Sequence, residues 1–194
     1  MMMKKRLAAM LFIGAAALLL ASYSNASDDS SIIVKSGNVF IDVIVEQEAS
    51  SAALASTDER LFQTWMSSHS EIPYVQLGGS ITITANRDLT GSYEIRDVLL
   101  KKDGSLKYSA QHSIKTGHVT DIQFDQGVGS FILTENMNAY LSSQSADYEP
   151  GAAIRGFKLY LGDTDESIVF VIRTDAGNAQ EQKAVFECIS AKPS

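Results

Sequence analysis

The most regular feature of the chain is a series of short β-type segments separated by turn-forming residues. Residues 81–84, Ile-Thr-Ile-Thr, alternate apolar and polar positions, as a strand with one buried face does. Residues 39–45 and 168–172 are almost continuously apolar and β-branched, which predicts central strands covered on both faces. Clusters of Gly, Asn and Asp recur at intervals of roughly 8–15 residues, as in proteins built from short antiparallel strands.

One segment breaks this β pattern and predicts a helix over residues 56–66. Residues 56–59, Ser-Thr-Asp-Glu, form a capping box, in which a hydroxyl caps the first turn and Glu59 reaches back to the backbone. The apolar residues that follow at helical spacing are Leu61, Phe62, Trp65 and Met66. We expect this stripe to pack on a sheet with Trp65 buried, and a surface stripe that docks a partner is the alternative.

Two further positions carry local information. Residues 102–105, Lys-Asp-Gly-Ser, predict a hairpin with a return strand over 106–110, because Asp-Gly accepts the two positive φ angles of a type I′ turn. Asp42 is the polar member of the apolar segment 39–45. A bend or a hydrogen-bonded position near a sheet edge explains this Asp, and a buried carboxylate in a functional site is the alternative.

Together these segments predict a mainly β fold. We expect an antiparallel β-sandwich of the immunoglobulin-like kind with one inserted amphipathic helix, and an α+β sheet is the alternative. No Ser-, Pro- or Gly-rich linker divides residues 27–194, so we expect a single β-rich domain there.

Residues 1–26 have the three-part order of a secretory signal peptide. Residues 4–6, Lys-Lys-Arg, precede an uncharged apolar run over 7–20, and small residues at 24–26 supply a cleavage point. The run is shorter than the roughly 20 residues of a membrane-spanning helix. We expect cleavage before Ser27 and a periplasmic or secreted protein without membrane contact, and an uncleaved anchor is the alternative.

The charge of the chain excludes some partners. Its formal net charge is −7, and without residues 1–26 it has 13 basic against 23 acidic residues, a formal charge of −10. Nucleic acids and anionic membranes attract clustered Lys and Arg, so we predict neither as a partner. Cys188 is the one cysteine and cannot form an intrachain disulfide, so it is either buried or paired with another chain.

The sequence contains no recognisable catalytic or metal-binding motif. The nucleophile elbow G-x-S-x-G is absent, and His112 and His118 are interpreted as exposed loop residues because further zinc ligands do not accompany them. The acidic loop 163–166 carries oxygens for calcium but lacks the full calcium-loop spacing, so a solvated hairpin tip is the simpler interpretation. We therefore predict no catalytic, cofactor-binding or metal-binding residues, no cofactor and no enzymatic activity.

Residues 80–124 combine several turn and strand motifs in a distinctive order. A strand ending in Ala85 precedes Thr90-Gly91-Ser92-Tyr93-Glu94-Ile95, and the Lys-Asp-Gly-Ser hairpin, Ser109-Ala110-Gln111-His112-Ser113 and the Gly117 turn follow. This order resembles that of the small periplasmic chaperones of curli assembly, two-sheet immunoglobulin-like domains that restrain amyloid formation by curli subunits. The resemblance implies a similar fold and a surface-fibre subunit as partner, and it assigns no functional residue. The paired cysteines of some of those proteins are absent from this chain.

These observations favour a non-catalytic secreted or periplasmic binding protein, a chaperone or assembly factor for surface fibres that acts through a sheet edge. Two alternatives stay open. A surface or fimbrial structural component, such as an adhesin, would need a self-association strand, for which residues 32–34 are a candidate. An enzyme with an unmarked active site would need a pocket with convergent polar groups and shifted pKa values.

Overall fold

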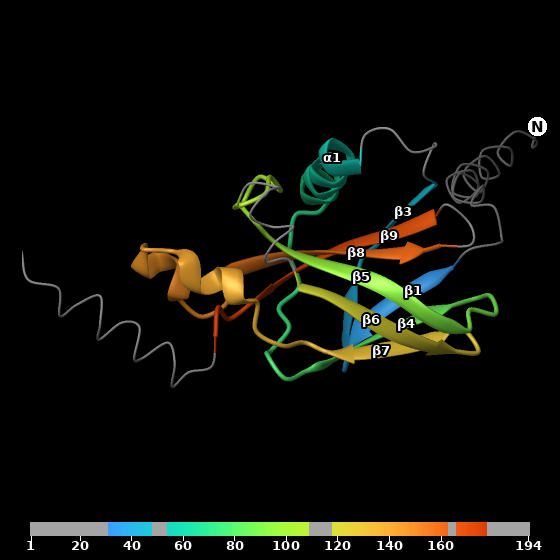
Figure 1. Ribbon diagram of the computed structural model, residues 1–194. Coiled ribbons are helices and arrows are strands. Elements are labelled where there is room, and N and C mark those ends of the chain that lie inside the picture. Colours follow the sequence, from blue (N-terminus) through green and yellow to red (C-terminus); the bar gives the residue numbers. More distant parts are fainter. Residues whose placement is uncertain (1–30, 48–53, 109–117, 163–165, 178–194) are drawn as a thin grey trace, which may run out of the picture. The chain divides into compact units, whose positions relative to one another are not determined.

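One antiparallel sheet of nine strands forms most of the described structure (Figure 1). The computed structural model describes residues 31–47, 54–108, 118–162 and 166–177. Across the sheet the strands run in the order β2 (Val39–Ile41), β1 (Ile32–Ser36), β4 (Ser80–Ala85), β7 (Val128–Ile132), β6 (His118–Asp125), β5 (Gly91–Leu100), β8 (Ala153–Leu161), β9 (Glu166–Thr174) and β3 (Ile44–Gln47). The predicted mainly β, antiparallel fold with one α-helix is confirmed for these residues.

The two edges of this sheet are joined by a very short piece of chain. β2 ends at Ile41 on one edge and β3 begins at Ile44 on the other, so Asp42 and Val43 alone connect them. An extended residue advances about 3.3 Å, and neighbouring strands lie about 4.8 Å apart. A flat sheet of nine strands could not bring its edges so close together. The sheet therefore curls, like half of a barrel, and so brings the end of β2 within reach of the start of β3.

The concave side of the curled sheet holds the main hydrophobic core. One cluster combines buried residues from both halves of the sheet, among them Val34, Ile81, Ile83, Phe124, Phe157, Leu159 and Phe170. The alternation predicted over residues 81–84 is confirmed, because Ile81 and Ile83 are fully buried while the threonines between and after them are half-buried. The stacked rings of Phe157 and Phe170, 5.0 Å apart, lie in this core.

Residues 39–45 do not form the single central strand that their apolar pattern predicts. The chain breaks at Asp42 and Val43, and the two parts are the edge strands β2 and β3, with Phe40 71% exposed. The pattern misleads because the segment crosses between two edges: Ile41 and Val43 pack into the concave core, whereas Ile44 packs into a second cluster on the other face. Asp42 lies between the two edge strands with its side chain 75% exposed, which agrees with the expected position near a sheet edge and contradicts a buried carboxylate. In contrast, residues 168–172 lie in β9 and are buried on both faces, as predicted.

The single α-helix, α1 (Leu54–Ser68), covers the convex face of β5, β8 and β9 (Figure 1). Trp65 is 0% exposed, which confirms the predicted core stripe, and its indole N–H donates to the carbonyl oxygen of Asp42 at 2.9 Å. The predicted capping box is wrong. The helix begins before it, and the Glu59 carboxylate accepts a hydrogen bond from the backbone N–H of Leu106 at 3.1 Å.

The type I′ turn predicted at Asp103-Gly104 is also wrong. Only Gly104 has a positive φ there, +81°, and the expected return strand amounts to one bridge between Leu106 and Leu100 in the described residues. The glycine serves a close approach instead, because a Cβ on Gly104 would lie 2.7 Å from the Cα of Gln63 in α1. Two consecutive positive φ angles, which a type I′ turn requires, occur at Gln126 (+47°) and Gly127 (+80°), between β6 and β7.

Replacing Trp65 by alanine should lower the free energy of unfolding by about 3–5 kcal/mol, because it empties a fully buried site and removes the hydrogen bond to Asp42. Urea denaturation of the two proteins measures this difference. Met66→Ala is the matched control on the same helix. Because Met66 is only partly buried, this substitution should lower the free energy of unfolding by less than Trp65→Ala does. A change below about 1 kcal/mol for Trp65→Ala would contradict the proposed packing.

Candidate functional site

β6 is fully paired on one side and nearly unpaired on the other. Residues 118–124 of β6 all have register partners in β5, whereas only Phe124 and Asp125 have partners in β7. Figure 1 shows β6 and β7 diverging from their common turn. In the part of the chain that the structure describes, the β7-facing edge of residues 118–123 therefore has no strand partner.

The turn between β6 and β7 fixes where this opening starts. The N–H of Gly127 donates to the carbonyl of Leu89 at 2.9 Å, and its carbonyl accepts from the N–H of Ala85 at 2.8 Å. A Cβ on Gly127 would lie 2.7 Å from the Ala85 carbonyl oxygen, so glycine permits this contact. At the second register pair from the turn, Phe124 stands opposite Gly129, and its ring covers this glycine. A Cβ on Gly129 would lie 2.6 Å from the ring. The two strands are held together at the turn and separate beyond it.

A cavity of about 130 Å³ lies behind the opening, on the concave side of the sheet. β5, β6, β7 and β8 all contribute to its walls, which include Thr120, Phe131 and Phe157. The rings of Phe131 and Phe157 are 5.7 Å apart, and Phe157 is fully buried. Ile132 also lines the cavity and is 55% exposed, so the cavity extends from the core to the surface.

A buried ion pair forms the polar wall of this cavity. The guanidinium of Arg155 binds both carboxylate oxygens of Asp97, Nε donating to Oδ1 at 3.1 Å and the NH2 nitrogen donating to Oδ2, and its NH1 nitrogen donates to the carbonyl of Thr134 at 2.6 Å. Both side chains are almost completely buried, which carries a desolvation cost that two-point hydrogen bonding offsets. Sequence reasoning missed this pair, since its members lie on two strands and 58 positions apart.

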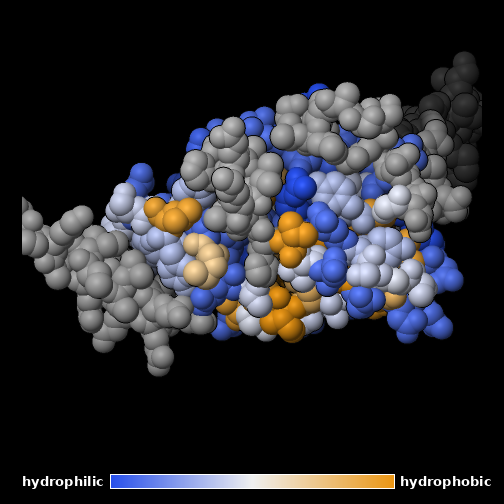
Figure 2. Space-filling view, viewed as in Figure 1, coloured by the Kyte–Doolittle hydropathy of each residue, from blue (hydrophilic) through white to orange (hydrophobic). Residues whose placement is uncertain are grey.

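The outer rim of the opening is acidic and partly apolar. Glu94 and Asp121 stand directly opposite each other on β5 and β6, and both are exposed. Arg96, the next residue on the same face of β5, donates to Asp58 at 2.9 Å rather than to Glu94 or Asp121. Val119 is 51% exposed on this face. Figure 2 shows apolar (orange) groups among hydrophilic ones on the face that carries β6 and β7.

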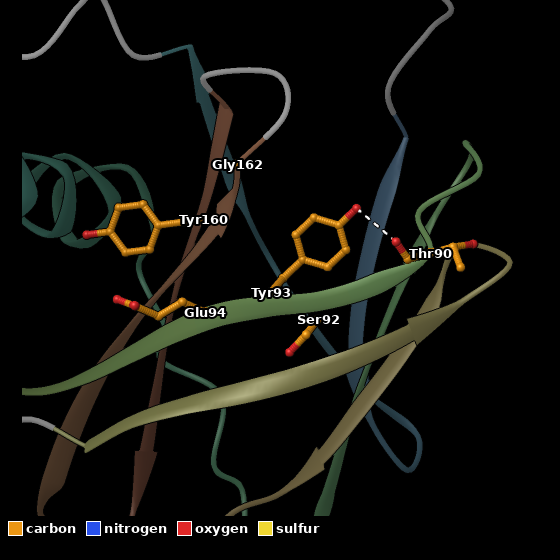
Figure 3. Close-up of a pocket in the computed structure, with 6 residues that line it drawn as sticks. All are labelled: Thr90, Ser92, Tyr93, Glu94, Tyr160 and Gly162. Atoms are coloured by element: carbon orange, nitrogen blue, oxygen red, sulfur yellow. Dashed lines mark hydrogen bonds between the residues drawn. The ribbon is translucent and has the colours of Figure 1, made fainter.

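A second, more open concavity of about 260 Å³ lies where β5 and β8 separate (Figure 3). Ile95 and Leu159 are the first register pair between these strands, and residues 91–94 of β5 have no partner in β8. The concavity lies at this unpaired end and is lined by Thr90, Ser92, Tyr93, Glu94, Tyr160 and Gly162. The Tyr93 hydroxyl donates to the Thr90 carbonyl at 3.5 Å. Glu94 is the one carboxylate among the described lining residues, whereas glycoside chemistry commonly requires two.

Several residues singled out from the sequence lie outside the described residues: the segment 1–26, His112, Asp163, Asp165 and Cys188. His118 is the first residue of β6 rather than a loop residue, because the strand extends to it. Glu166 of the acidic loop is not a solvated hairpin tip, since it is buried and bonds Arg87 at 2.6 Å.

Within residues 31–177, gaps excepted, no group of three or more potential metal ligands occurs, and no helix is long and apolar enough to cross a membrane.

Five described residues with shifted pKa values line neither concavity: Tyr74, Asp103, Tyr108, Asp147 and Tyr148. Burial raises the pKa of Tyr74, Tyr108 and Tyr148, and hydrogen bonds from Ser105 lower the pKa of Asp103. For Asp147, burial is outweighed by hydrogen bonds from Lys107 and Ser142, so its pKa lies below the usual value.

Replacing Arg155 by methionine should lower the free energy of unfolding by about 3–5 kcal/mol, because it leaves the buried Asp97 carboxylate without its partner. Denaturant unfolding of wild type, Arg155→Met, and the double variant with Asp97→Leu measures the effect. The double variant should recover much of the loss, since it removes the unpaired charge. Equal stability of wild type and Arg155→Met would show that the pair is not buried as described.

The chain was compared with models of protein families, with curated proteins and with solved structures. No family model, curated protein or solved structure matches it. The functional conclusions therefore rest on the geometry of the opening between β6 and β7.

Proposed function

We propose that this protein binds an extended segment of another protein chain, which adds as a strand to the edge of β6 that has no strand partner among the described residues. The observation that carries the proposal is the unequal pairing of β6, complete toward β5 and limited to Phe124 and Asp125 toward β7. A free strand edge offers N–H and C=O groups in a row, which an extended peptide satisfies by main-chain hydrogen bonds.

The turn geometry indicates which backbone groups of β6 are offered. Asp125 pairs with Val128 across the two-residue turn, so its backbone groups point toward β7. Successive residues of a strand direct these groups to opposite sides. Val119 and Asp121 therefore direct theirs into the opening, whereas Thr120 and Ile122 direct theirs toward β5.

The cavity behind the opening supports the same function. Strand addition gains affinity from main-chain bonds and specificity from pockets for alternate side chains. An apolar cavity of about 150 Å³ holds a benzene molecule. The cavity lined by Phe131 and Phe157, about 130 Å³, therefore has room for one apolar side chain of the bound segment.

The two outer edges of the sheet are less suited to this role. β2 and β3 have three and four residues, and Asp42 and Val43 join them directly. Very short edge strands are a common protection against unwanted pairing. The β6 edge is longer and has a cavity beside it, so we place the binding site there.

The proposal includes the wider expectations from the sequence. The segments β2-β1-β4-β7 and β6-β5-β8-β9-β3, linked by two register pairs, would correspond to the two sheets of an immunoglobulin-like sandwich. The resemblance to curli-assembly chaperones covers residues 80–124, which include the β6 edge. With residues 1–26 as a cleaved signal peptide, the protein would be periplasmic or secreted and would act on a fibre-forming surface subunit.

Asp121→Pro should weaken the binding of such a subunit about tenfold, because it removes one N–H that points into the opening and leaves the bonds to β5 in place. The assay is the delay of fibril formation, followed by amyloid-dye fluorescence, when a small molar fraction of this protein is added to an amyloid-forming surface subunit. Asp121→Asn is the matched control, since it removes the charge and keeps the N–H.

We expect wild type and Asp121→Asn to delay fibrils, and Asp121→Pro to need about tenfold more protein for the same delay. Thermal unfolding of the three proteins checks that the proline variant is folded. Equal delays by the proline and asparagine variants, or no delay by wild type, would contradict the proposal.

A further inference from the structure

We infer that the segment bound at the β6 edge alternates apolar and basic residues. This inference rests on the proposed function and names the chemistry of the partner. Successive side chains of a strand point to opposite faces of the sheet. A segment added to β6 would therefore place every second side chain on the concave side and the others on the convex side, and these two sides differ strongly in character.

The concave side accepts apolar side chains. The cavity there is lined by Phe131 and Phe157, and its polar wall is occupied by the hydrogen bonds between Arg155 and Asp97. A charged side chain entering this space would be desolvated beside an ion pair whose members already bind each other. Apolar residues therefore fit the inward positions of the segment.

The convex side attracts basic side chains. Asp121 is exposed on β6, and Glu94 stands opposite it on β5. Like charges directly opposite each other in a sheet are unfavourable, and opposite charges are favourable. The cation on this face of β5, Arg96, is bonded to Asp58 at 2.9 Å. A Lys or Arg placed beside Asp121 would neutralise the acidic pair, whereas an acidic residue would add a third like charge.

The same charges oppose pairing with a second copy of this chain. A two-fold contact between β6 edges would bring the same acidic residues of both copies together. The formal charge of the chain, −7, adds a general repulsion between copies. The observations thus favour a different protein with a basic extended segment as the occupant.

Three synthetic nine-residue peptides test this inference, labelled for fluorescence anisotropy and titrated with the full-length protein at low salt. One alternates Val and Lys, one alternates Val and Glu, and the third repeats the Val/Lys sequence with N-methyl groups on alternate backbone nitrogens. We expect the Val/Lys peptide to bind at least tenfold more tightly than the Val/Glu peptide, and N-methylation to abolish binding. The methylated peptide keeps the charge, so it separates strand addition from nonspecific attraction.

Asp121→Lys should remove or invert the preference for the Val/Lys peptide. Glu71→Lys is the matched control, because it makes the same change in net charge at an exposed residue that lines neither concavity. Methylation-sensitive binding without a preference for Val/Lys would overturn the inference and leave the proposed function standing. If the methylated peptide bound as tightly as the unmethylated Val/Lys peptide, or if no peptide bound, both the inference and the proposed function would be overturned. If the wild-type protein formed dimers and Asp121→Pro abolished them, a second copy of this chain would be the occupant of the edge, and the inference would be overturned.

Discussion

The short connection through Asp42 and Val43 is the constraint on which the rest of the structure depends. It joins the two outermost strands of a nine-stranded sheet, so the sheet has to curl until the end of β2 lies close to the start of β3. The indole N–H of Trp65 donates a hydrogen bond to the carbonyl oxygen of Asp42 and so links α1 to this connection. The separation of β6 and β7 lies in the middle of the strand order, away from the two edges that this connection joins.

Ion pairs join α1 and the two neighbouring strands β5 and β8. Asp58 of α1 binds Lys158 of β8 at 2.8 Å and Arg96 of β5 at 2.9 Å, and the pair of Asp97 and Arg155 lies on the opposite face of the same two strands. Such pairs require good geometry to offset the loss of hydration. These pairs link β5 to β8 on both faces of the sheet, and β5 is also the strand that pairs with residues 118–124 of β6.

Local sequence signals predicted several elements but not which strands are neighbours, and two local predictions, the capping box at 56–59 and the type I′ turn at Asp103-Gly104, were wrong. The alternation at 81–84 and the stripe around Trp65 each depend on residues close in sequence, and both predictions are confirmed. The edge position of residues 39–47 and the pairing of Asp97 with Arg155 depend on register between distant strands, which apolar periodicity does not encode. The type I′ turn at Gln126-Gly127 was missed because Gln rarely adopts the positive φ found there.

Residue-resolved hydrogen exchange of the β6 backbone amides, measured by NMR, tests the central claim that this edge is free. The account predicts an alternating pattern in the unbound protein. The amides of Val119 and Asp121, which point into the opening, should exchange rapidly, and those of Thr120 and Ile122, which pair with β5, should be protected. Equal, strong protection of all four amides would show that the edge is already paired and would contradict the account.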